Sequence, residues 1–200
     1  WQMRGAVARA VAGAAPFLGL RAMLAAPLAC AAVLPACAQP SDPATQAAAR
    51  SLVASAAPMD LHSHAGRVVL RRGTNQRPFE PLAAPMRAGG MRVVALCIVA
   101  DTPATEITGD NRIRAFRNPA PGELYAHSGA AFARMRALLG RDGLEVVTTR
   151  AGLRAAMAPG AAPSILIGSE GADFLEGRID RVGEAFQQHH LRLLQLTHYR

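Results

Sequence analysis

The sequence contains no lysine, and its 22 basic residues are all arginines. These arginines are scattered along the chain, and only Arg71 and Arg72 are adjacent. Aromatic residues make up 4% of the chain, so no basic stripe alternates with aromatic side chains as expected of a nucleic-acid-binding surface. The formal net charge of +8 therefore does not indicate a nucleic-acid partner.

Cysteine is also scarce. Two of the three cysteines, Cys30 and Cys37, lie in an apolar N-terminal segment, and Cys97 lies in a second apolar run. A single cysteine among apolar residues is typical of a core position, so the spacing predicts no disulfide framework.

Charged residues are missing between Ala22 and Ala38, downstream of Arg4 and Arg9. A basic start, an apolar stretch and small residues at 36–38 are typical of an export signal. We therefore interpret residues 1–38 as a signal peptide and expect the protein to be exported, either periplasmic or membrane-attached.

Two alternatives remain for this segment. The first is a transmembrane anchor, which Pro27 and Pro35 make a weak spanning helix. The second is a lipoprotein signal, because Leu34 stands three residues before Cys37. Acylation of Cys37 would attach the protein to a membrane through its N-terminus.

Residues 39–58 are expected to form a linker with one helical stretch, and residues 59–200 a domain with its own core. Within this domain the patterns predict strands at 59–62, 91–101, 144–149, 163–171 and 191–198, and helices at 123–139, 150–158 and 176–190. Gly140 is expected to end the first of these helices. Ile179, Val182 and Phe186 share one face of the last. Alternating strands and helices predict a parallel sheet with crossover helices.

Polar side chains stand where these predicted strands end. His62 and His64 follow the first strand, Asp101 the second, Glu170 another and His198 the last. In a β/α barrel the carboxyl ends of the strands meet at one mouth, where catalytic groups gather. We expect an α/β fold, a partial (β/α)8 TIM-type barrel truncated after about five strands.

The sequence Asp60-Leu-His-Ser-His64 predicts a metal site, because side chains two apart on a strand share a face and imidazole is a good zinc ligand. Glu170, between Gly168 and Gly171, adds a carboxylate that is able to bridge two cations. His198 would bind metal or donate a hydrogen bond to an oxyanion. His127, His189 and His190 lie on or at the end of helices, and we interpret them as structural.

Two blocks, residues 59–66 and 165–198, resemble the membrane (renal-type) dipeptidase family. That family begins its barrel with D-x-H-x-D, and later has an apolar strand ending in "EG", a helix and R-x-x-x-L-T-H; Arg192 to His198 matches the last piece. The resemblance covers roughly residues 59–200. It implies a zinc-dependent dipeptidase with two zinc ions and a small dipeptide substrate, and a homodimer as a possible assembly.

Residue by residue, the resemblance makes His62 a zinc ligand, Glu170 the bridging carboxylate and His198 the histidine that contacts substrate. His64 departs from the family, which has aspartate there, and this departure puts dipeptide specificity in question. The family's remaining ligands have no counterpart within these 200 residues. The alternatives are another amidohydrolase-type metal hydrolase, or a non-catalytic exported relic of the family.

Overall fold

The computed structural model describes residues 42–73 and 75–200, all of which belong to one compact unit, Ser41–Arg200. The predicted signal peptide, anchor and lipoprotein cysteine lie outside the described residues. Among the helices that are described, none combines the length and the apolar character needed to cross a membrane.

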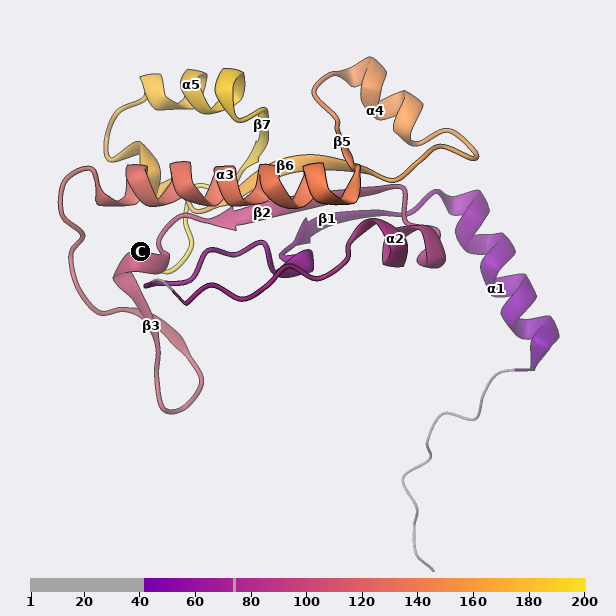
Figure 1. The fold of residues 1–200 in the computed structure, drawn as a ribbon, viewed down its shortest axis with the longest axis horizontal. Coiled ribbons are helices and arrows are strands. Elements are labelled where there is room, and N and C mark those ends of the chain that lie inside the picture. Colours follow the sequence, from indigo (N-terminus) through magenta and orange to yellow (C-terminus); the bar gives the residue numbers. More distant parts are fainter. Residues whose placement is uncertain (1–41, 74) are drawn as a thin grey trace, which may run out of the picture. The chain divides into compact units, whose positions relative to one another are not determined.

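Five parallel strands form the main sheet (Figure 1). They are β1 (Met59–Ser63), β2 (Val93–Val99), β5 (Glu145–Val146), β6 (Ser164–Glu170) and β7 (Leu191–Leu194). β2 pairs with β1 on one side and with β6 on the other, and β7 continues the sheet beyond β6. The predicted α/β class and parallel sheet are thus confirmed.

The prediction of a strand at 144–149 needs the largest correction. Only two of its residues form β5, and they pair with Ser164 and Ile165 at the beginning of β6. β7 pairs with the same strand from Ile167 to Ser169. As a result β5 does not separate β2 from β6, and the four longer strands lie side by side in chain order.

Four of the five α-helices were predicted, although not with the same boundaries. The five are α1 (Pro43–Ala56), α2 (Ala83–Gly89), α3 (Glu123–Asp142), α4 (Arg150–Ala156) and α5 (Asp180–Gln188). α2 and a hairpin of β3 (Thr105–Ile107) and β4 (Ile113–Ala115) were not predicted. α3 continues through Gly140 and ends at Gly143, whose left-handed backbone lets its N–H donate to the carbonyl of Leu139.

The core lies between the sheet and α3, which runs along one face of it (Figure 1). The predicted periodicity of α3 is confirmed, since its buried residues include all five apolar positions expected from the sequence: Leu124, Phe132, Met135, Leu138 and Leu139. Opposite them, Val94, Leu96 and Ile98 of β2 are at most 4% exposed. The alternate residues Ala95 and Cys97 are also fully buried, so β2 is covered on both faces.

The C-terminal part of the chain needs one addition and one correction. The face shared by Ile179, Val182 and Phe186 lies largely outside the core: Ile179 is 80% exposed, Phe186 is 51% exposed and the buried residue of α5 is Ala185. The last strand also stops early, at Leu194 instead of 198. His198 therefore lies on the segment that follows β7, not on the strand itself.

Candidate metal centre

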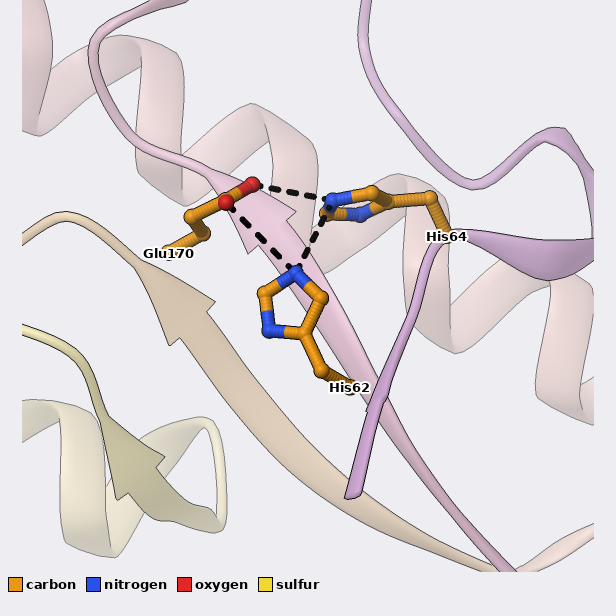
Figure 2. A group of neighbouring side chains, drawn as sticks. All are labelled: His62, His64 and Glu170. Carbon is orange, nitrogen blue, oxygen red and sulfur yellow. Dashed lines mark hydrogen bonds and ion pairs between the residues drawn. The ribbon is translucent and has the colours of Figure 1, made fainter. Parts of the chain in front are cut away.

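The carboxyl ends of β1 and β6 bring three predicted ligands together (Figure 2). His62 lies in β1, His64 follows directly after it, and Glu170 is the last residue of β6. β2 lies between these two strands and pairs with both. Residues 106 positions apart in the chain thus meet because their strands flank the same neighbour.

The three side chains point at a common centre. The Nε2 atoms of His62 and His64 are 3.3 Å apart, and they lie 3.5 and 2.9 Å from the two carboxylate oxygens of Glu170. Two ligand atoms at ~2.1 Å from a tetrahedral zinc ion are ~3.4 Å apart. The spacing of these atoms therefore fits one cation held among them.

A hydrogen bond to the main chain of β2 orients the imidazole of His64. Nδ1 of His64 lies 3.0 Å from the backbone carbonyl of Cys97 in β2. A carbonyl oxygen only accepts, so Nδ1 carries a hydrogen and Nε2 of the neutral ring is a bare lone pair. Two residues earlier on the same strand, the carboxylate of Asp60 accepts the backbone N–H of His62 at 3.0 Å.

This assignment creates a conflict that a cation resolves. The lone pair of His64 Nε2 faces a carboxylate oxygen of Glu170 at 2.9 Å. Two lone pairs at that distance repel each other unless a positive species lies between them, either a proton or a metal ion. With the third donor atom of His62 at the same centre, a metal ion satisfies all three side chains together.

Glu170 is the central residue of the site. Its side chain is 16% exposed, and a third imidazole, that of His198, reaches one of its oxygens at 3.3 Å. The next residue, Gly171, has φ +86°, a value that side chains rarely adopt. A Cβ on Gly171 would lie 2.8 Å from Asp173 Oδ2 and 3.5 Å from His198 Cβ, so glycine lets the chain turn closely against His198.

His198 is held from behind by Asp101, which lies two residues past β2. Nδ1 of His198 is 2.8 Å from Oδ1 of Asp101, and the backbone N–H of Tyr199 donates to Oδ2 at 3.1 Å. From the sequence, Asp101 was only a polar residue at a strand end. Its pairing with a residue 97 positions away left no signal in the sequence.

Asp173 is a residue that the sequence analysis missed. Burial and the nearby charge of Asp101 raise the pKa of its carboxyl above the usual value, and Arg200 lies 3.4 Å from Oδ1. Its Oδ2 atom is buried without a hydrogen-bond partner among the described residues. Asp173 therefore lies close enough to Asp101 and His198 for both of their charges to influence its pKa.

A pocket of about 570 Å³ opens beside the cluster. His64 and Glu170 line one end, and Arg71 and Arg72 line the wall. Apolar side chains complete it, among them Val69, Val99, Ile107 and Ile113. The lining therefore combines two guanidinium groups and the carboxylate of Glu106 with an apolar surface.

The other histidines are not part of the group of metal-ligating side chains found in the described residues. His127 lies on α3, and burial lowers the pKa of its imidazole. His189 follows α5 and stacks on Phe132 at 4.4 Å, where burial lowers its pKa as well. Neither belongs to the group of three metal-ligating side chains found among residues 42–73 and 75–200.

In comparisons with known proteins, no family model and no curated protein matches this chain.

Proposed function

We propose that the protein is a zinc-dependent dipeptidase, hydrolysing the amide bond of small dipeptides with a metal-activated hydroxide. The observation that carries this proposal is the convergence of His62, His64 and Glu170, with Nε2 of His64 2.9 Å from a carboxylate oxygen of Glu170. Imidazole and carboxylate ligands around an accessible position are typical of catalytic zinc sites.

The sheet supports the further proposal of a partial (β/α)8 barrel. β1, β2, β6 and β7 are parallel and adjacent in chain order, which is the arrangement of consecutive strands in such a barrel. All four candidate site residues stand at or beyond the carboxyl ends of strands, the face that carries the active site in these folds. The barrel proposed here therefore has four of its strands in this chain, with β5 as a short addition.

The proposed chemistry assigns one task to each side chain. His62 and His64 would hold a zinc ion, and Glu170, with its two oxygens facing different imidazoles, would bridge to a second. When bound, zinc polarises a carbonyl and lowers the pKa of a bound water to ~7. His198, 11% exposed and directed at the same carboxylate, would donate a hydrogen bond to the oxyanion that forms at the substrate carbonyl.

The pocket beside the cluster supports a substrate with a free carboxylate. Arg71 and Arg72 lie on its wall, and a guanidinium matches a carboxylate with two parallel N–H groups. Val99, Ile107 and Ile113 offer an apolar surface to the side chain of the substrate. A dipeptide presents an amide, a carboxylate and a side chain, which correspond to the candidate metal centre, the arginines and the apolar surface of this pocket.

His64 in place of aspartate favours one alternative, another amidohydrolase-type hydrolase acting on a cyclic amide, a lactone or a phosphoester. A neutral ligand leaves the site with one negative charge fewer than the family pattern and so alters which leaving groups it supports. A non-catalytic relic of the family would retain the fold and lack metal.

Glu170→Gln in the full-length protein tests the proposal. Glutamine keeps the size of the side chain but removes the charge that offsets the cations. We expect the second zinc ion to be lost and turnover to fall by roughly a thousandfold or more, ~4 kcal/mol of transition-state stabilisation. Metal content by elemental analysis and turnover on a panel of dipeptides are the measurements.

Two variants sharpen this test. Glu145→Gln, on exposed β5 at the other end of the sheet, is the matched control and should retain full metal content and turnover. His64→Asp restores the family pattern and should keep metal while raising dipeptidase activity. Full activity of Glu170→Gln or of metal-stripped protein would refute the mechanism, and a metal-free, inactive wild type would favour the relic.

A further inference from the structure

Glu106 is a carboxylate beside the candidate metal centre that the proposed reaction does not use. It lies on β3 and lines the same pocket of about 570 Å³ as His64 and Glu170. Its side chain is 32% exposed, so a molecule in the pocket is able to reach it. Arg71 and Arg72 line this pocket as well, and the pocket therefore carries charges of both signs.

The ion pair of Glu106 with Arg114 uses only one of the two carboxylate oxygens. Nε of Arg114 donates to Oε1 at 3.0 Å, and a terminal nitrogen of the same guanidinium lies 2.9 Å from the same oxygen. Within residues 42–73 and 75–200, no hydrogen bond or ion pair involves Oε2. Since an ionised carboxylate has about four acceptor positions, Glu106 is able to accept further N–H donors while it keeps Arg114.

The hairpin places this acid next to the apolar part of the pocket. Glu106 stands opposite Arg114 on β4, and the next cross-strand pair is Ile107 with Ile113. Both isoleucines line the pocket, whereas Arg114 does not and is 66% exposed. An ion pair with so exposed a partner is weakened by water, so Arg114 leaves Glu106 attractive to a second cation.

We infer that Glu106 is a specificity-determining residue, which binds an ammonium group on the amino-terminal residue of the substrate. The inference rests on the proposed function for the identity of the substrate as a dipeptide. Every dipeptide has an α-ammonium group, and one that begins with lysine has a second ammonium on its side chain. Either group offers three N–H donors to a carboxylate, in charge-assisted hydrogen bonds. With Arg71 and Arg72 at the substrate carboxylate, the two charges of the pocket would match the two charges of a dipeptide.

Glu106→Gln in the full-length, zinc-loaded protein tests the inference, because glutamine keeps the size of the side chain and removes its charge. Two substrate pairs each differ by one ammonium group. Alanyl-leucine against propionyl-leucine isolates the α-ammonium, and lysyl-leucine against norleucyl-leucine isolates the side-chain ammonium. In one of these pairs we expect the preference in kcat/KM for the member with the ammonium to fall ~10-fold, mainly through KM, since the contact is one of binding. The pair that responds identifies the group that Glu106 binds.

Two variants of the same hairpin are the controls. Arg114→Gln breaks the same ion pair but keeps the charge of Glu106, so it should retain or increase the preference for the ammonium. Asp110 is 67% exposed, forms an ion pair with Arg112 at 3.4 Å and does not line the pocket. Asp110→Asn should leave kcat/KM for all four compounds within about twofold of the wild type.

Unchanged preferences in both substrate pairs would overturn the inference, and the proposed function would stand as long as the wild type hydrolyses the dipeptides. An equal loss in Arg114→Gln and Glu106→Gln would also overturn it, because the ion pair would then only support the hairpin. A wild type that hydrolyses none of the four compounds would defeat the proposed function. The compounds then stay intact, and isothermal titration calorimetry compares their Kd values directly. A ~10-fold weaker Kd of Glu106→Gln for the ammonium-bearing member alone would still support the inference, and equal Kd values or no binding would overturn it.

Discussion

The middle and the carboxyl ends of the same strands have opposite characters. In the middle of β2, Leu96 and Ile98 are 0% exposed and pack under α3. At the carboxyl ends, the side chains of His62 and His64 are 39% and 34% exposed and converge on Glu170. Different parts of one sheet therefore have different roles: the middle of the strands stabilises the fold, and their carboxyl ends hold the side chains that could bind metal.

The largest expected effect is the loss of stability on truncating an aromatic side chain in the core, which tests the stabilising role of the region under α3. Phe132 of α3 is 2% exposed and contacts Phe174 and His189. Phe132→Ala is expected to lower the free energy of unfolding by ~3–5 kcal/mol through lost contacts and a cavity. Urea denaturation followed by circular dichroism measures this change.

The matched control is Phe186→Ala on α5. Phe186 is 51% exposed and its ring lies under the guanidinium of Arg192, at 3.9 Å. Its loss should cost no more than ~1 kcal/mol. Folded Phe132→Ala protein should still bind metal with wild-type stoichiometry. Loss of metal binding together with stability would contradict the independence of the core and the candidate metal centre.

Gly168 lies on the boundary between the two regions. A Cβ there would lie 2.5 Å from Cys97 Sγ and 3.2 Å from a methyl of Leu193. Gly168→Ala should therefore destabilise the protein by ~1–3 kcal/mol through overpacking. Cys97→Ala removes the closest atom and should recover part of the loss in the double variant.

Gly129→Ala provides the control, since a Cβ at this α3 position meets no atom within 4 Å. Alanine in an open helical position should raise stability by ~0.5–1 kcal/mol. The measurement is thermal unfolding of the wild type, Gly168→Ala, the Gly168→Ala/Cys97→Ala double variant and Gly129→Ala. Equal stability of the Gly168→Ala and wild-type proteins would contradict the close approach of β2, β6 and β7.

The arginines of the pocket should influence substrate affinity without influencing stability. Arg71→Ala together with Arg72→Ala is expected to raise KM for dipeptides about tenfold, ~1.4 kcal/mol, because both guanidinium groups are exposed and their ion pairs are weakened by water. KM for the same peptides amidated at the C-terminus should barely change. Arg154→Ala on α4 is the control, and an equal effect on both substrate sets would exclude carboxylate recognition by this pair.

The smallest expected effect concerns the reactivity of Cys97. This residue contacts both regions: its backbone carbonyl accepts a hydrogen bond from His64 of the candidate metal centre, and its thiol is buried in the sheet. Burial raises the pKa of this thiol to about 11. In the folded protein it should therefore stay protonated and resist alkylation at pH 8.5, whereas urea-unfolded protein should react readily. Peptide mass spectrometry after iodoacetamide treatment measures both, and fast labelling of the folded chain would contradict the burial.

The regular parts of this fold could be predicted because their patterns are local. The apolar spacing of α3 and the continuous apolar run of β2 both agree with their burial in the structure. Boundaries that depend on packing were predicted less well. Gly140 has no neighbour within 4 Å of an added Cβ and its helix continues, whereas Gly143 adopts the left-handed backbone that ends it.

Burial of α5 could not be predicted from its apolar face. Periodicity places Ile179 and Phe186 together, but whether a face is covered depends on which other element lies against it. In the described residues α5 contacts β7, and Ala185 is the residue that becomes buried. The length of β5 was overestimated for a related reason. The apolar pattern of residues 144–149 did not reveal that β2 pairs with one edge of β6, so that β5 is not a strand between the two.

By itself the sequence determined the residue types of the candidate site and the ends of the strands where they stand. His62 and His64 share a face because they are two apart on a strand, and Glu170 follows an apolar run that ends in a tight turn. These are consequences of local backbone geometry. Only the tertiary structure decided that β6 pairs beside β2, that Asp101 pairs with His198, and that Cys97 orients His64. Those contacts join residues far apart in the chain, and their energies depend on burial and distance, which exist only once the sheet has formed.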